Sequence, residues 1–222
     1  MKISALSYYV SSTLTLINGL SFWKIPLLFF KKTVLFKLKN SLEFYVSDLM
    51  DVWTLKEIIL DDQYQQFKKI RKNEVVVDIG AGVGDFSVLV SRRAKKVFAF
   101  EMNREKFKLL EKNVKINRCQ NIVIASKEVD SLETVFRKLK INDCDFLKID
   151  CEGCEYQIFK DVSKKTLSRI KYIAMEVHFF NQKMKHEYLI FKNLLISHGF
   201  KIREVASPVH CSIGFLYAEK NS

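Results

Sequence analysis

The stretch "VVVDIGAGVGDF", residues Val75–Phe86, decides the fold. It begins as a run of β-branched residues, which is typical of a short buried strand. It continues into Gly80, Gly82 and Gly84, and glycines let the backbone turn tightly and approach a ligand closely. A helix beginning after Gly84 would offer its free N-terminal amides to that ligand. The stretch therefore predicts a strand, a ligand-binding loop and a helix in this order.

Strand and helix patterns alternate along most of the remaining chain. Further strands are predicted at 96–101, 121–126, 145–150, 170–178, 200–205 and 213–219, and helices at 85–95, 104–116, 131–140, 155–161 and 183–198. Such alternation predicts a parallel sheet with helices on both faces. The last two strands have no helix between them and should be antiparallel neighbours. We expect a doubly wound, Rossmann-like α/β sheet, mostly parallel, with an antiparallel strand at the C-terminal end.

The first 70 residues are predicted to form an appendage of the main domain, which spans residues 71–222. An amphipathic N-terminal helix is expected to pack on the body of the protein. Two apolar sets recur at helical spacing, one made of Leu6, Val10, Leu14 and Ile17 and the other of Tyr9, Leu16 and Leu20. Residues 33–46 alternate as a β-hairpin with Asn40 and Ser41 as a two-residue turn. A helical stretch over residues 51–70 follows.

Charge and cysteine content suggest a location and a range of partners. The net charge is +12, which fits either a lysine-rich solvated surface or attraction to phosphates, nucleic acid or anionic membranes. Five cysteines do not suggest a disulfide framework, so we expect a reducing, cytoplasmic location. Residues 3–23 are too polar to span a membrane. "WKIPLLFFKK", residues 23–32, places apolar residues beside basic ones, and peripheral membrane contact is the alternative reading.

Two acids identify the ligand that suits the glycine loop. The G-x-G-x-G spacing differs from the dinucleotide fingerprint. Asp78 would repel a pyrophosphate but suits an ammonium group, and Glu101, at the end of the next strand, is placed to bind ribose hydroxyls. S-adenosylmethionine carries both groups. The predicted cofactor-binding residues are Asp78, Gly80, Ala81, Gly82, Gly84, Glu101, Met102, Asn103, Ser126 and Asp150.

"FLKIDCEGCEYQIF", residues 146–159, follows the fourth strand and supplies Asp150, Glu152 and Glu155 to the same edge of the sheet. A single C-x-x-C is a weak zinc signal, because structural zinc needs four ligands and no second pair is evident. We therefore interpret Cys151 and Cys154 as structural thiols.

The fifth strand ends in "MEVH", which places Glu176 and His178 on one face of the strand. His178 is a candidate general base, or else a rim histidine that only forms hydrogen bonds. The predicted catalytic residues are His178, Asp150, Glu152 and Glu176. We favour a metal-free site, with magnesium bound by Asp150, Glu152 and Glu176 as the weaker alternative.

Together these motifs resemble the FkbM-type family of S-adenosylmethionine-dependent methyltransferases, over roughly Val34 to His178. "VVVDIGAGVGDFSVLVS" is similar to the family's cofactor loop, "FLKIDCEGCEYQIF" to its I-D-x-E-G-x-E motif and "EIILDDQY", ending at Tyr64, to its lead-in segment. Met102 stands where the family often has proline, and Gly82 where it often has asparagine. The resemblance implies methyl transfer to a hydroxyl of a sugar, a glycan or a secondary metabolite, with Tyr64 and Glu155 at the acceptor.

Two alternatives have other partners. A nucleic-acid methyltransferase that modifies amino groups would carry an N/D-P-P-Y/F motif, where this chain has Asp150-Cys151-Glu152-Gly153. An acid-rich rim also repels phosphates, so we do not expect nucleic acid as the partner. The other alternative is a non-catalytic membrane-peripheral protein. The oligomeric state is left open.

Overall fold

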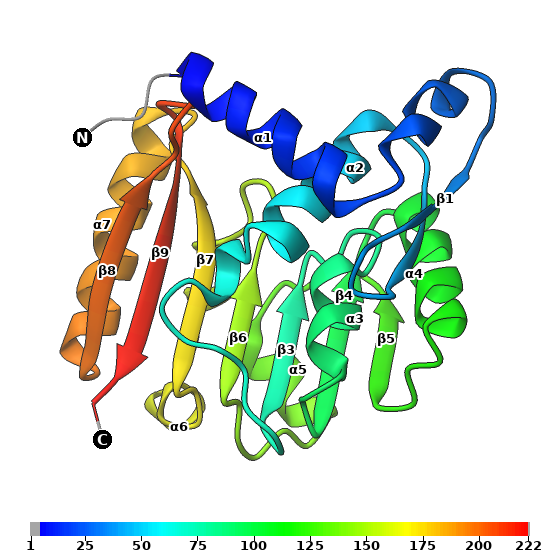
Figure 1. The fold of residues 1–222 in the computed structure, drawn as a ribbon. Coiled ribbons are helices and arrows are strands. Elements are labelled where there is room, and N and C mark those ends of the chain that lie inside the picture. Colours follow the sequence, from blue (N-terminus) through cyan, green and yellow to red (C-terminus); the bar gives the residue numbers. More distant parts are fainter. Residues whose placement is uncertain (1–4, 222) are drawn as a thin grey trace.

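The computed structural model describes residues 5–221 around a seven-stranded sheet (Figure 1). The strand order is β5-β4-β3-β6-β7-β9-β8. The strands are β3 (Val75–Ile79), β4 (Lys96–Glu101), β5 (Ile122–Ser126), β6 (Phe146–Ile149), β7 (Tyr172–His178), β8 (Phe200–Ala206) and β9 (Ile213–Lys220). Strands β3 to β7 pair in parallel, whereas β9 is antiparallel to both β7 and β8. The predicted fold class is confirmed.

Helices cover both faces of this sheet. They are α3 (Asp85–Ser91), α4 (Arg104–Ile116), α5 (Leu132–Lys138), α6 (Lys164–Ser168) and α7 (Gln182–Ser197). Side chains of α5, α6 and α7 share one hydrophobic cluster with Leu147, while α3 shares a second cluster with Phe146. Neighbouring residues of a strand point to opposite faces, which explains this division. The helix predicted at 155–161 is wrong in extent, because only a 3₁₀ turn, η4 (Gln157–Phe159), forms there.

The predicted hairpin forms from β1 (Val34–Lys37) and β2 (Glu43–Val46). Its connection has three residues rather than the predicted two, because the Leu38 amide donates to the Leu42 carbonyl. The last loop residue, Ser41, has a φ of 67°, the left-handed conformation usual at this place in three-residue hairpins.

The helical stretch predicted over 51–70 is interrupted. It consists of α2 (Leu49–Leu55), a π-helical turn η2 (Lys56–Leu60) and a 3₁₀ turn η3 (Gln63–Gln65). Asp62 has a φ of 56°, a left-handed conformation that an α-helix cannot continue through. The break places Tyr64, which is only 2% exposed, against the end of β6.

Helix α1 (Ala5–Gly19) and the 3₁₀ helix η1 (Phe22–Phe29) lie across the edge at which the parallel strands end (Figure 1). The predicted helix is present, but its first predicted apolar set faces solvent. Leu16 and Leu20 of the second set pack in the hydrophobic cluster of the hairpin. Leu6 and Leu14 are exposed, while Ser12 is buried and the Tyr8 hydroxyl donates to Glu57. Within residues 5–221, no helix combines the length and the apolar character needed to cross a membrane.

The appendage and the sheet share one hydrophobic cluster. Phe36 and Phe44 of the hairpin belong to the same cluster as Val76 and Phe146 of the sheet. Removing the hairpin would expose this face of the sheet to water. The division into units at residue 70 stays a prediction.

Candidate active site

The glycine loop after β3 lies directly against the loop after β6. Gly80 has a φ of 76°, and a Cβ atom there would lie 1.6 Å from the Asp150 carbonyl oxygen. A Cβ atom at Gly82 would meet nothing within 4 Å. The loop is therefore packed against the protein at Gly80 and has free space beside Gly82. That space would allow a ligand to approach the backbone of the loop.

Glu101, at the end of β4, is tied to this loop. Its two carboxylate oxygens accept hydrogen bonds of 2.7 Å from the Gly82 and Asn103 amides. Burial raises the pKa of Glu101, and the two amides partly oppose that rise. A carboxylate can accept further bonds beyond these two, so Glu101 fits the predicted binding of ribose hydroxyls.

The other predicted cofactor residues surround this point. Ala81 is buried, and its amide donates to Phe100. Asn103 caps α4 through its side chain, and Met102 is exposed. Ser126 pairs with Glu101 across β4 and β5. Their contacts with a cofactor stay predictions.

Asp78 has partners inside the protein, and its contact with a cofactor stays a prediction. It is completely buried, it accepts a 2.6 Å bond from the Ser87 hydroxyl, and its other oxygen lies 3.2 Å from the Lys148 ammonium. Lys148 also donates to the Gly80 carbonyl. The cation that Asp78 faces is therefore internal, and this geometry gives no support to direct contact with a ligand ammonium. Lys148 was missed, although a lysine within an otherwise apolar strand was a visible signal.

Three predicted catalytic side chains meet at the ends of β6 and β7. Asp150, Glu176 and His178 each offer a ligand atom within 4.8 Å of the others. Glu152 is exposed and lies outside this group, so the alternative magnesium set that includes Glu152 is not the one the structure assembles.

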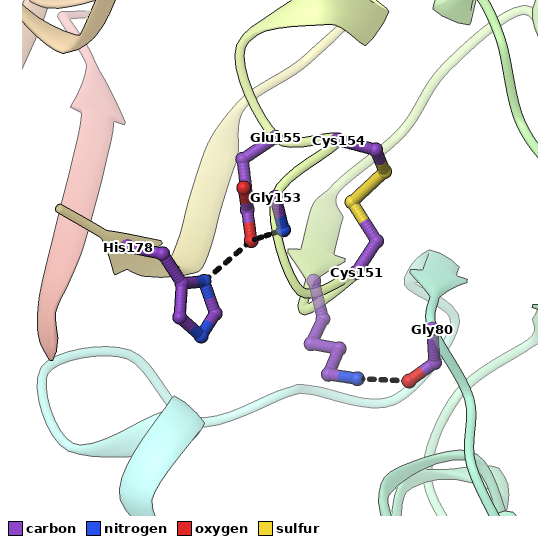
Figure 2. The surroundings of a disulfide bond; sticks show 7 residues. Gly80, Cys151, Gly153, Cys154, Glu155 and His178 are labelled. Carbon is purple, nitrogen blue, oxygen red and sulfur yellow. Dashed lines mark hydrogen bonds and ion pairs between the residues drawn. A yellow bond between two sulfur atoms is a disulfide. The ribbon is translucent and has the colours of Figure 1, made fainter. Parts of the chain in front are cut away.

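Two buried side chains hold this group. The Tyr64 hydroxyl donates to Asp150 Oδ2 at 2.9 Å, and Glu155 Oε1 lies 2.6 Å from His178 Nδ1. Figure 2 shows Glu155 and His178 pointing toward each other. Because Tyr64 and Glu155 are buried and contact site residues, the geometry does not support their predicted direct contact with an acceptor.

His178 is positioned to be protonated. Burial lowers its pKa, but the hydrogen bonds and charges of Glu155 and Glu176 outweigh this effect and raise the pKa to about 10. A protonated imidazole cannot accept a proton, so the free site does not favour the predicted general-base role. Burial and the nearby Asp150 raise the pKa of Glu176, although His178 opposes this.

Cys151 and Cys154 form a disulfide, which contradicts their interpretation as structural thiols. The bond closes the short loop between Asp150 and Glu155 (Figure 2). Glu152 and Gly153 both have positive φ, and this turn brings the two cysteine Cα atoms to 5.5 Å. The spacing in sequence could not reveal the turn.

The disulfide should stabilise the fold. Replacing both Cys151 and Cys154 by serine is expected to lower the free energy of unfolding by about 2 kcal/mol, because a short closed loop in the unfolded chain is lost. Urea denaturation without reductant measures the loss, with Cys211→Ser, an exposed free cysteine, as the control. Equal midpoints for the double variant and the control would contradict the bond.

Asp85, the first residue of α3, should make stability depend on pH. It is buried, and burial raises its pKa from 3.8 to about 7, with Lys148 opposing the rise. Between these values the folded state holds a proton that the unfolded state releases, so the free energy of unfolding falls as the pH rises. Each pH unit between the two pKa values lowers the free energy of unfolding by about 1.4 kcal/mol.

The substitution Asp85→Asn removes this titrating carboxyl group. We expect the free energy of unfolding of the variant, relative to that of the parent protein, to be higher at pH 8 than at pH 4. Urea unfolding at both pH values measures this difference. A stability difference that is the same at both pH values would show that Asp85 ionises normally.

Two family descriptions match the chain. The TRM5/TYW2 methyltransferase domain matches residues 45–148, and the methyltransferase FkbM domain matches residues 120–202. Neither match alone covers half of the chain. The first contains the glycine loop and the second contains the group formed by Asp150, Glu176 and His178.

Relatives of known sequence carry RNA methyltransferase names. The tRNA (guanine(37)-N(1))-methyltransferase Trm5b of Pyrococcus abyssi is 42% identical over 62 residues, which are 28% of this chain and 19% of that protein. An RNA methyltransferase of Caldanaerobacter subterraneus subsp. tengcongensis is 22% identical over 78% of this chain and 40% of its own length. The chain thus spans less than half of the length of these relatives.

Solved structures show the same fold. M. jannaschii TYW2 in complex with AdoMet has a TM-score of 0.55 at 17% identity, covering 85% of each chain. M. jannaschii tRNA m1G37 methyltransferase has a TM-score of 0.55 at 18% identity, covering 86% of this chain and 58% of the other.

The fold is that of class I methyltransferases, and both family matches are to methyltransferase domains, which agrees with the predicted enzyme class. The predicted cofactor agrees with the M. jannaschii TYW2 structure, which is a complex with AdoMet. The expectation that nucleic acid is not a partner is contradicted, because the relatives are named tRNA or RNA methyltransferases. The rim is less acidic than the prediction assumed, because Asp78 is paired with Lys148 and Glu155 with His178 inside the protein.

Proposed function

We propose that the protein transfers a methyl group from S-adenosylmethionine to RNA. The observation that carries this proposal is the match of residues 45–148 to the TRM5/TYW2 methyltransferase domain, together with relatives named RNA methyltransferases. The net charge of +12 supports it, because the phosphate backbone dominates the affinity of proteins for nucleic acids.

The cofactor would lie along the open side of the glycine loop. Gly82 leaves room for it, and Glu101 would bind its ribose hydroxyls. Bound S-adenosylmethionine supplies a methyl group on a positively charged sulfur. The protein's part is to hold donor and acceptor in line, which can supply several kcal/mol of the barrier.

The acceptor would meet the cofactor beside Asp150, Glu176 and His178. Tyr64 orients Asp150, and Glu155 orients His178. Since His178 is protonated in the free site, the two carboxylates are the groups able to accept a proton from the acceptor. The raised pKa of Glu176 brings it closer to neutral pH, which suits that role.

A hydroxyl of a sugar or a secondary metabolite is the second candidate acceptor. One observation favours it, since the FkbM domain match over residues 120–202 contains all three of these side chains. The two candidates predict different labelled products from the same assay.

The deciding assay incubates the protein with S-adenosylmethionine labelled in the methyl group, together with total RNA or a glycan mixture. We expect label in RNA that ribonuclease releases. Label in glycans alone would favour the second candidate, and no label in either would overturn both. Calorimetry with S-adenosylhomocysteine checks that the protein used is folded and binds the cofactor product.

Two exposed aromatic side chains near the N-terminus should contribute to RNA binding. Trp23 is 67% exposed and Phe30 is 86% exposed, and Lys31 and Lys32 follow directly. Bases stack on such rings, and each stacked base is worth about 1–3 kcal/mol. Replacing Trp23 and Phe30 by alanine is therefore expected to weaken RNA binding at least tenfold.

Filter binding at several salt concentrations measures this loss. Leu6→Ala is the matched control, because Leu6 is 76% exposed on α1 but has no ring on which a base could stack. An equal loss in both variants, or none in the aromatic variant, would exclude a stacking surface.

A further inference from the structure

The ends of β6 and β7 assemble a set of side chains with the composition of a metal site. Register pairs Ile149 with Met175, so the next residues, Asp150 and Glu176, emerge from neighbouring strands at the same edge. Glu176 and His178 are two residues apart on β7 and therefore share a face. The result is two carboxylates and one imidazole whose ligand atoms lie within 4.8 Å of one another.

That spacing is close to what an ion requires. With bonds of about 2.1 Å to nitrogen or oxygen, ligands on opposite sides of an ion are about 4.2 Å apart. Small side-chain rotations would bring the three atoms into this range. Mixed carboxylate and imidazole ligands suit first-row divalent ions, since imidazole binds iron and zinc while carboxylates bind manganese and magnesium.

The orientation of His178 supports the same reading. Its Nδ1 is held by Glu155 at 2.6 Å, so Nε2 faces the two other carboxylates. Nε2 lies 3.4 Å from Glu176 Oε1, a longer contact than the roughly 2.7–3.2 Å usual for a hydrogen bond, so Glu176 holds Nε2 less tightly than Glu155 holds Nδ1. A carboxylate on one ring nitrogen with the other nitrogen facing the ligand group is the arrangement by which proteins orient a metal-binding histidine.

Buried charge gives an independent reason for a cation. Glu155 is fully buried, and its Oε2 has no hydrogen-bond partner among the described residues. Three carboxylates thus converge on a single imidazole. Lys148, which attracts Asp150, is already bonded to Asp78 and Gly80. A buried charge without compensation is costly, and a divalent ion would offset it.

We propose that Asp150, Glu176 and His178 Nε2 bind a divalent transition-metal ion, with Glu155 as the outer carboxylate that orients His178. Binding of the ion displaces the proton that Nε2 carries in the metal-free site and releases it to the solvent. The role of the ion rests on the proposed function: it would hold the acceptor oxygen or nitrogen beside the cofactor and lower the pKa of an acceptor proton. Binding of the ion itself does not depend on which acceptor the enzyme uses.

The test uses manganese chloride as the probe. Protein freed of metal with EDTA and then desalted is titrated with Mn²⁺, and the electron paramagnetic resonance signal of the free ion is followed. We expect each chain to remove one ion from solution. Glu176→Gln should weaken binding at least tenfold, and Glu155→Gln should weaken it about tenfold to a hundredfold through the orientation of His178.

The variant Glu152→Gln distinguishes this metal site from one that would use the exposed Glu152. It should bind Mn²⁺ as tightly as the parent protein, since Glu152 lies outside the group. The proposal is overturned if the parent protein binds no Mn²⁺ even when the ion is added at millimolar concentration. It is also overturned if Glu152→Gln weakens Mn²⁺ binding as much as Glu176→Gln does. Binding of S-adenosylhomocysteine shows that each variant is folded, and His178→Gln replaces Glu176→Gln if the latter is not.

The outcomes also separate this inference from the proposed function. If Mn²⁺ binds through Glu176 but RNA is not methylated, the metal site is supported and RNA methylation is contradicted. If RNA is methylated in EDTA and no Mn²⁺ binds, RNA methylation is supported and the metal site is contradicted.

Discussion

Replacing Gly80 by alanine is expected to abolish cofactor binding and to destabilise the fold by more than about 4 kcal/mol, a loss in the range of the most damaging single substitutions. The φ of 76° alone costs an L-residue about 1–2 kcal/mol. The larger part comes from the new Cβ atom, which would lie 1.6 Å from the Asp150 carbonyl oxygen. Because that atom belongs to the backbone, the loops after β3 and β6 would have to separate.

Gly82→Ala is the matched control for this prediction. Gly82 also has a positive φ, of 54°, but its Cβ atom would meet nothing within 4 Å. We expect a loss of only about 1–2 kcal/mol in stability, the cost of the positive φ alone. Thermal unfolding and calorimetry with S-adenosylhomocysteine measure both variants. If Gly80→Ala unfolds within a few degrees of Gly82→Ala, the two loops are not in contact as described.

The second large effect should come from Lys148→Met. This change leaves Asp78, which is completely buried, without its cation, and removing one partner of a buried ion pair typically costs about 3–5 kcal/mol. It also deprives the Gly80 carbonyl of its bond to Lys148. The loss of stability should therefore be accompanied by weaker cofactor binding, because Gly80 belongs to the cofactor loop.

Two further variants give this prediction its controls. Lys171→Met breaks an ion pair with Asp145 in which the lysine is 63% exposed, and it should cost less than about 1 kcal/mol. The double variant Asp78→Asn with Lys148→Met removes the unpaired charge and should regain part of the lost stability. Urea unfolding of all three decides the matter, and an equal cost for the two single lysine variants would refute a buried ion pair.

The sheet could be predicted from the sequence because its signals are local. Most strands of the parallel core are apolar runs such as Val75–Ile79 that alternate with helical segments, so the parallel direction of these strands follows from chain connectivity. The glycine loop and the acid at the end of the next strand likewise lie at positions that the fold itself determines.

The contacts inside the site could not be predicted, because they depend on which side chains meet in space. The break at Asp62 swings Tyr64 onto Asp150, and the turn at Gly153 closes the disulfide. Which of the two apolar sets of α1 packs on the body could not be predicted for a related reason: periodicity identifies an apolar face but not whether a neighbouring element covers it.

The sequence by itself determined the parallel sheet, the cofactor loop and the class of chemistry, since these depend on hydrophobic period and on short motifs that act through their own backbone. Only the tertiary structure decided the use of each acid. In the folded protein, Asp78 forms an ion pair with Lys148, and Glu155 contacts His178. Asp150 and Glu176 lie together at the end of the sheet. The energy of a charged group depends on its partners and its access to water, and these are set only when distant segments pack together.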